Sequence, residues 1–123
     1  MSLIALAEDD DNLRELLGEL LQDAGFEVTL LEDGFELIDY LELAARRPDL
    51  VIADIRMPGI TGIEAIAKAR AQGVSCPVIV MTSQPDNESR ARAAELGNTR
   101  FLAKPAEPGE LVRYAREMCV RPH

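Results

Sequence analysis

The sequence predicts an α/β fold: a doubly wound, five-stranded parallel sheet with helices on both faces. Short apolar runs alternate five times with stretches of helical periodicity, and this alternation is typical of parallel sheets. The run 50–53 has four consecutive apolar residues, as in a strand buried on both faces. With 123 residues, 47% of them hydrophobic, the chain can bury a core as one domain spanning 1–123.

The strands are expected where apolar residues run together. The run 27–31 is more polar than the others, which favours a place at an edge of the sheet. The run 50–53 ends in Asp54, a carboxylate delivered to the carboxyl-end rim, where ligands collect in open α/β sheets. The expected strands are 3–7, 27–31, 50–54, 77–82 and 101–105.

The first helix has the clearest periodicity. Asn12, followed three residues later by Glu15, is a candidate for its N-terminal cap, and Gly25 ends it. Its leucines recur at helical spacing, so we expect them on one buried face. They are Leu13, Leu16, Leu17, Leu20 and Leu21.

The remaining helices follow from turns and caps. A second helix follows the turn at 33–34 and ends near 47–48, and a third begins with the capping box Thr61 to Glu64. The fourth, 87–96, is built of alanine, arginine and glutamate and should be the least firmly packed. The last carries apolar residues at helical spacing from 111 to 119.

The composition excludes several classes of function. The net charge of −9, from 13 basic and 22 acidic residues, disfavours binding to nucleic acid. The apolar stretches are too short to cross a bilayer, and no signal segment opens the chain, so we expect a cytoplasmic protein with no membrane contact. Cys76 and Cys119 are too few for a disulfide framework or a zinc site and are expected to be small buried hydrophobes. The lone histidine, His123, gives no support to a Ser-His or Cys-His mechanism.

Chemistry-bearing residues terminate four of the expected strands. Parallel strands end at the same rim, so these side chains should meet there. Carboxylates in a small space require a cation, and hard oxygen ligands suit Mg²⁺. A lysine and a hydroxyl beside them complete the parts for phosphoryl transfer to a carboxylate. The residues are Glu8, Asp9, Asp54, Thr82 and Lys104.

In these motifs the chain resembles the receiver domain of two-component response regulators, the CheY-like family. The matching pieces span almost the whole chain in the family's order and are specific as a set. They are Glu8-Asp9, Asp54-x-x-Met57-Pro58-x-x-x-Gly62, Thr82-Ser83 and Lys104-Pro105.

The resemblance implies a strand order of 2-1-3-4-5, five helices and a set of site roles. Asp54 would accept a phosphoryl group from a phosphohistidine. Mg²⁺ would be held by Asp9, Asp54 and the carbonyl of Arg56, with Glu8 acting through water. Lys104 would bridge to the acceptor or its phosphate, and the Lys104-Pro105 bond would be cis. Thr82 would bond the phosphoryl oxygen, and Phe101 would follow it inward as a switch.

The resemblance also implies partners. A sensor histidine kinase or a phosphotransfer protein would supply the phosphoryl group, and an effector protein or a fused output domain would read the altered surface. That surface, formed by the fourth helix, the fifth strand and the last helix, would also support a homodimer. The domain would be a switch rather than an enzyme with a separate substrate, although it would catalyse its own phosphorylation and dephosphorylation.

One departure from the commonest family pattern, and two residues near the expected site, carry expectations. Ala106 stands where phenylalanine is frequent, so packing beneath the last helix is expected to be looser. Arg56 and Gln84, each two residues beyond a site residue, could cover the phosphoryl group. We therefore predict that they set the lifetime of the acyl phosphate.

Three other functions remain open at this stage. A phosphatase of the haloacid dehalogenase kind also uses a strand-end aspartate, but it needs an acid two residues later, where this chain has Arg56. A flavodoxin-like flavin binder needs a hydroxyl- and glycine-rich phosphate loop, whereas residues 8–11 are all acidic. A degenerate receiver would serve only for protein contact, and the intact acceptor set argues against it.

Overall fold

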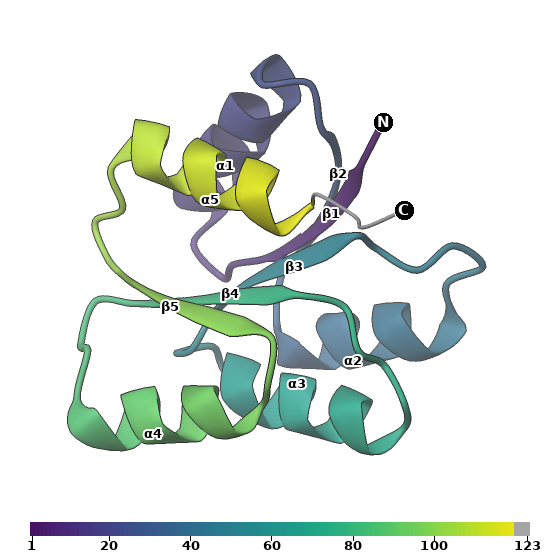
Figure 1. Cartoon of the computed structure of the whole chain (residues 1–123), viewed down its shortest axis with the longest axis vertical. Coiled ribbons are helices and arrows are strands. Elements are labelled where there is room, and N and C mark those ends of the chain that lie inside the picture. Colours follow the sequence, from purple (N-terminus) through teal and green to yellow (C-terminus); the bar gives the residue numbers. More distant parts are fainter. Residues whose placement is uncertain (120–123) are drawn as a thin grey trace.

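The computed structural model describes residues 1–119 and shows a five-stranded, fully parallel sheet (Figure 1). The order of the strands is β2-β1-β3-β4-β5, as the resemblance implied. All the strands run in the same direction, so their carboxyl ends fall at one rim. The strands are β1 (Leu3–Ala7), β2 (Glu27–Leu31), β3 (Leu50–Asp54), β4 (Val78–Thr82) and β5 (Thr99–Ala103).

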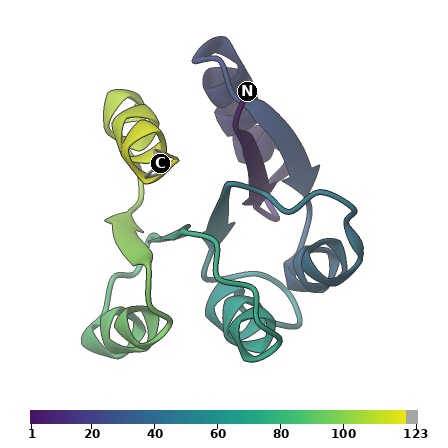
Figure 2. The ribbon, with the colours of Figure 1, turned by 45° about the vertical axis from the view of Figure 1, so that its right-hand side comes forward.

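Five helices cover the two faces of the sheet. Figures 1 and 2 show α1 and α5 together on one face and α2, α3 and α4 on the other. This is the doubly wound arrangement that right-handed crossovers between parallel strands produce. The helices are α1 (Asp11–Asp23), α2 (Gly34–Leu43), α3 (Gly62–Ala71), α4 (Asn87–Glu95) and α5 (Pro108–Met118).

The sheet divides the apolar interior into two cores. Alternate side chains of β1, for example Ile4 and Leu6, pack with Leu17 and Leu21 of α1 and with α5. The intervening alanines of β1 pack with α2 and α3 on the opposite face. β1, β3 and β4 are buried along their whole length, which explains why they are apolar up to Asp54 at the end of β3 and Thr82 at the end of β4.

The N-terminus of α1 differs from the prediction. Asp10, and not Asn12, is the cap, because its carboxylate accepts hydrogen bonds from the backbone N–H groups of Asn12 and Leu13, at 3.0 and 3.1 Å. Among the five leucines, Leu17 and Leu21 are buried, but Leu16 is 63% exposed. A single helix face is too narrow to bury all five, so the expectation was wrong for Leu16.

Other boundaries shift by a few residues. α2 ends at Leu43 rather than near 47–48, and β5 begins at Thr99, two residues before its apolar part. The capping box of Thr61 and Glu64 is present at the start of α3. α4 buries only Ala93, in agreement with its lack of large apolar residues. Cys76 and Cys119 are partly rather than fully buried, and His123 lies outside the described residues.

Candidate phosphoacceptor site

The candidate residues follow strand ends that are adjacent in the sheet. The last residue of β1, Ala7, pairs with Ala53, so Glu8 and Asp54 are the next residues along neighbouring strands. Asp54 in turn pairs with Met81, just before Thr82, and Thr82 pairs with Ala103, just before Lys104. The register therefore brings segments from four strands to one rim.

Lys104 links the two buried acids of the site. Its Nζ atom donates to Glu8 Oε1 at 2.6 Å and to Asp54 Oδ2 at 2.9 Å. Glu8 is 1% exposed and Asp54 6%, so both ionic contacts are largely shielded from solvent. A buried carboxylate requires such a partner, because burial of an unpaired charge is strongly unfavourable.

Burial and charge act in opposite directions on Lys104. Partial burial by itself lowers the pKa of its ammonium group, but the hydrogen bonds to Glu8 and Asp54 outweigh this and raise the pKa above its ordinary value. Lys104 is therefore a permanent cation at neutral pH. It is positioned to neutralise charge on an oxygen bound to Asp54.

Asp9 completes a cluster of three carboxylates. Oxygen atoms of Glu8, Asp9 and Asp54 all lie within 4.8 Å of one another. Burial and a hydrogen bond to Glu8 raise the pKa of Asp9, an indication that its negative charge is not fully compensated. Three hard oxygen donors around a small space, with one acid undercompensated, fit a divalent cation such as Mg²⁺.

The backbone after Asp54 is held close to the carboxylate of that residue. The N–H of Arg56 donates to Asp54 Oδ1 at 3.3 Å, and the N–H of Gly62 donates to the carbonyl of Ile55 at 3.0 Å. A Cβ atom at Gly62 would lie 2.3 Å from the carbonyl oxygen of Asp54. Only glycine fits here, so the loop between β3 and α3 can fold tightly beneath the acceptor.

On the other side of the acceptor, Thr82 is 1% exposed at the end of β4. Its Oγ1 accepts a hydrogen bond from the N–H of Gln84 at 3.1 Å, and its carbonyl accepts one from the N–H of Lys104 at 2.8 Å. The Lys104-Pro105 bond is cis, as expected. Phe101 of β5 is partly buried against the core, and the guanidinium of Arg90 lies 4.5 Å from the centre of its ring.

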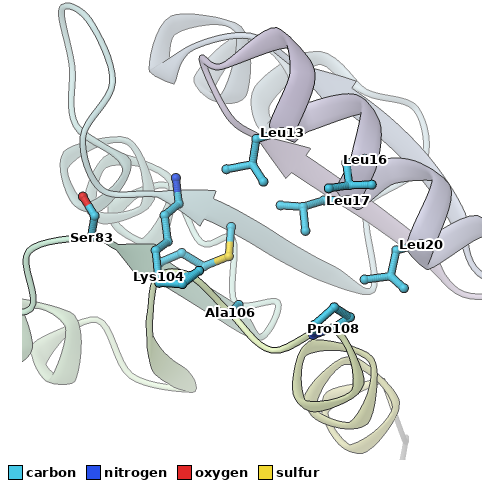
Figure 3. Close-up of a pocket in the computed structure, with 10 residues that line it drawn as sticks. Leu13, Leu16, Leu17, Leu20, Ser83, Lys104, Ala106 and Pro108 are labelled. Atoms are coloured by element: carbon cyan, nitrogen blue, oxygen red, sulfur yellow. The ribbon is translucent and has the colours of Figure 1, made fainter.

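An apolar pocket of about 490 Å³ opens beside Lys104, between α1 and the start of α5. Figure 3 shows Leu13, Leu16, Leu17 and Leu20 of α1 along one side of the pocket, with Ala106 and Pro108 across from them. Ala106, with its small side chain, is among the residues that line this space. The expected looser packing at this position stays a prediction.

Sequence reasoning missed one buried charge near the site, that of Arg14. This residue is 8% exposed and lies on α1 at helical spacing from Leu17, Gly18 and Leu21, which are also buried. That spacing is the signal that could have found it. An arginine on the apolar face of a helix needs polar partners in the interior.

Comparisons with known proteins identify the class of molecule that this fold and site define. The family model described as "Response regulator receiver domain" matches residues 4–116. The chain belongs to this family, and it is a phosphoacceptor receiver domain of two-component signal transduction. Receiver domains generally bind Mg²⁺ at an acidic pocket, and this chain has a cluster of three acids, Glu8, Asp9 and Asp54.

Particular relatives agree in sequence and in structure. The chain is 38% identical over 112 residues to the transcriptional regulatory protein FixJ of Bradyrhizobium diazoefficiens, covering 88% of the chain and 52% of FixJ. It is 37% identical over 123 residues to the transcriptional regulatory protein CpxR of Escherichia coli, covering all of the chain and 51% of CpxR. The solved structure of the chemotaxis protein CheY4 of Vibrio cholerae has a TM-score of 0.85 at 28% identity, over 96% of this chain and 98% of CheY4.

The relatives differ in length from this chain. It spans about half of FixJ and CpxR, but 89% of a 14.6 kDa protein of Leptolyngbya boryana to which it is 33% identical over 95% of its own length. Within residues 1–119, none of the helices is long and apolar enough to cross a membrane.

Proposed function

We propose that Asp54 accepts a phosphoryl group from a phosphohistidine in a Mg²⁺-dependent reaction, and that the domain, spanning 1–123, then switches an output in the cytoplasm. The observation that carries this proposal is the arrangement around Asp54. Lys104 bonds Asp54 and Glu8 together, and Asp9 lies within 4.8 Å of both acids. A nucleophile, a fixed cation and a set of metal ligands therefore meet at one rim.

The transfer exchanges one bond to phosphorus for another. A carboxylate oxygen of Asp54 attacks the phosphorus atom in line, and the P–N bond to the histidine breaks. The histidine nitrogen leaves with the electron pair of that bond. The ring is then a neutral imidazole if its other nitrogen carries a proton, and otherwise the leaving nitrogen takes a proton from solvent. Lys104 neutralises charge on the transferred oxygens, and the hydroxyl of Thr82 donates to one of them.

Asp9, Asp54 and the carbonyl of Arg56 would hold the Mg²⁺ ion, with Glu8 acting through water. When bound, the ion supplies charge neutralisation for the phosphoryl oxygens and for the acids. Lys104 pairs with both Glu8 and Asp54 in the protein itself, but its single charge balances only one of the two carboxylates. The raised pKa of Asp9 supports its assignment as an acid that a bound cation would stabilise in its ionised form.

The test is the intact mass of the protein after incubation with acetyl phosphate and Mg²⁺. We expect one phosphoryl adduct on the wild type and none on Asp54→Asn or in the presence of EDTA. Asp39→Asn, an exposed acid on α2, is the matched control and should be labelled like the wild type. Equal labelling of Asp54→Asn would overturn the assignment of Asp54, and the absence of any adduct on the wild type would favour a receiver that serves only for protein contact.

The partners follow from the same proposal. A histidine kinase or phosphotransfer protein would deliver the phosphoryl group, and α4, β5 and α5 would present the output to an effector, a fused domain or a second copy of the chain. Phosphorylation adds about 1.5 to 2 negative charges, and Thr82 and Phe101 would transmit this change toward α4. Light scattering with and without acetyl phosphate tests the dimer, and the molar mass of a monomer in both conditions would exclude it.

A further inference from the structure

Arg14 is a buried charge that takes no part in the proposed phosphoryl transfer. Within residues 1–119, four polar or charged side chains are buried: Glu8, Arg14, Asp54 and Thr82. Three of them belong to the acceptor site. The fourth, Arg14, lies on α1 among leucines, where an apolar residue would pack with less desolvation cost. Its guanidinium group therefore needs an explanation other than packing.

The contacts of Arg14 lead to the metal-site acids. Its Nη1 atom donates to the backbone carbonyl of Glu8 at 2.9 Å, and this hydrogen bond is buried. Its Nη2 atom pairs with Asp11 Oδ1 at 2.6 Å and lies 3.6 Å from Glu32 Oε1. The side chains of Asp11 and Glu32 are 80% and 65% exposed, so these two ion pairs are weak and screened. The buried bond to the carbonyl is the contact that solvent cannot replace.

That carbonyl belongs to the peptide group that joins Glu8 to Asp9. The N–H of Glu8 donates to Leu31 at 3.1 Å, and the Glu8 carboxylate is held by Lys104 and by the N–H of Asp10. With Arg14 on the carbonyl, Glu8 is fixed at its amide, its side chain and its carbonyl. The orientation of the Glu8–Asp9 peptide plane determines where the side chain of Asp9 points.

We propose that Arg14 is a positioning residue for the cation site. It holds the Glu8–Asp9 peptide so that the Asp9 carboxylate stays near Glu8 and Asp54, although the three acids repel one another. This inference rests on the proposed Mg²⁺ site. It assigns to α1 a part in metal affinity without any contact between Arg14 and the metal.

Geometry and charge make opposite predictions for Arg14→Met, which keeps the apolar stem but removes the charge and the donors. Arg14 is a cation close to a cation site, so a purely electrostatic role predicts tighter Mg²⁺ binding in the variant. A positioning role predicts weaker binding, by about tenfold, the lower end of the range for residues that orient metal ligands. Arg14→Lys keeps the charge but loses the two-pronged geometry, and we expect intermediate weakening.

The experiment is calorimetric titration of the metal-free protein with MgCl₂, at low and high NaCl, with circular dichroism to verify folding. Glu32→Gln, which removes only an exposed partner of Arg14, is the control and should bind like the wild type. A dissociation constant for Arg14→Met equal to or below that of the wild type overturns the inference. If Arg14→Met does not fold, Arg14→Lys decides, and a dissociation constant unchanged from the wild type overturns it.

Failure of the underlying site has a different outcome. If the wild type does not bind Mg²⁺, or if Asp54→Asn binds it as tightly as the wild type does, the proposed metal site itself is wrong. If the wild type binds, Asp54→Asn does not, and Arg14→Met binds normally, only the role of Arg14 is wrong. A fall in the melting temperature of Arg14→Met with unchanged Mg²⁺ affinity identifies a purely structural arginine and also overturns the inference.

Discussion

At the scale of single residues, the acceptor strand depends on a position with no side chain. Gly62 is the first residue of α3, and its N–H bonds to the carbonyl of Ile55 at 3.0 Å. The carbonyl oxygen of Asp54 occupies the place where a Cβ atom would be, at 2.3 Å. Backbone cannot move aside as a flexible side chain can. A larger residue at Gly62 would therefore shift the loop between β3 and α3 together with Asp54.

Gly62→Ala is therefore expected to destabilise the fold by about 1–3 kcal/mol, the usual cost of overpacking. Gly109→Ala is the matched control. Gly109 also lies in the first turn of a helix, but its Cβ atom would meet only the end of the Glu107 side chain, at 3.3 Å. Chemical denaturation measures both changes, and equal stability of the two variants would contradict the steric explanation.

Asp9 gives a prediction for pH dependence. Its pKa is raised in the folded protein by partial desolvation and by the hydrogen bond and charge of Glu8, so its ionised form destabilises the fold. The protonated form of Asp9 favours the folded state, so its contribution to stability is lost as the pH rises through the pKa of the folded protein. The contribution returns as the pH falls toward the pKa of Asp in the unfolded chain, about 3.9. Without Mg²⁺, Asp9→Asn should be more stable than the wild type at pH 7, by no more than about 1 kcal/mol because the side chain is exposed.

The difference should shrink toward pH 4, where the wild-type acid is protonated. Thermal melts in EDTA at both pH values measure it, with Asp39→Asn as a control that lies outside the cluster. A difference that does not depend on pH would contradict this account.

Arg56 and Gln84 lie on the two loops that flank the acceptor. The N–H of Arg56 donates to Asp54 Oδ1, and the N–H of Gln84 donates to Thr82 Oγ1. Both residues therefore lie next to the site. Both side chains are exposed and could shield an acyl phosphate from water. We expect Arg56→Ala and Gln84→Ala to speed loss of the phosphoryl adduct several-fold, as measured by intact mass over time. Lys68→Ala, an exposed cation on α3, should leave the decay rate unchanged.

At the scale of the elements, α4 is anchored at its C-terminal end by a side chain of α3. It buries only Ala93, but an arginine of α3 reaches the turn that follows α4. Arg70 donates from Nε to the carbonyl of Leu96 at 3.1 Å and from Nη2 to that of Gly97 at 3.0 Å, and its Nη1 bonds to Val74 at 3.1 Å. One side chain thus holds the C-terminus of α4 against α3.

Arg70→Met should destabilise the protein by about 1–3 kcal/mol, the cost of removing charged donors from backbone acceptors. It should also increase amide hydrogen exchange in α4 more than in α1. Arg92→Met is the control, because Arg92 forms an exposed pair with Glu88 at 3.0 Å that is worth less than about 0.5 kcal/mol. Uniform acceleration across all helices would show that Arg70 does not act on α4 in particular.

The sequence predicted most elements because their signals are local. Apolar runs ending in charged or hydroxyl residues located the strand ends, and the Thr61 capping box located the start of α3. The cap of α1 could not be predicted, because Asp10, Asp11 and Asn12 are adjacent and all can cap a helix. The start of β5 is polar and is defined by its pairing with β4, which no local pattern reveals.

The candidate site was predictable in part, for a related reason. Three strand ends identified Glu8, Asp9, Asp54 and Lys104, which the structure brings into contact or within a few ångströms. Arg14 was missed because a helical arginine is ordinarily exposed, and only tertiary packing shows that it is buried. The exposure of Leu16 likewise depends on how α1 is rotated against α5.

At the scale of the whole molecule, net charge opposes compaction. The chain carries a charge of −9, and the first 45 residues contain only one basic residue, Arg14. Self-repulsion of this kind destabilises the folded state and is screened by salt. A divalent ion bound at the acidic cluster should stabilise further by a specific mechanism.

We therefore expect MgCl₂ to raise the melting temperature more than NaCl at equal ionic strength. At one hundred times the dissociation constant, binding to one site contributes about 2.7 kcal/mol. The excess effect of Mg²⁺ should disappear in Asp54→Asn, whereas the effect of NaCl should remain. Equal effects of the two salts on the wild type would exclude a specific site.

The contact between Lys104 and Glu8 joins residues 96 positions apart in the chain. During translation at about 5–20 residues per second, Lys104 leaves the ribosome on the order of 5–20 s after Glu8. β1 and β3 are synthesised well before the strand that carries their counter-charge. A nascent polypeptide interrupted before β5 would display the acids without the lysine that pairs with them, so the acidic site forms only after Lys104 has been synthesised.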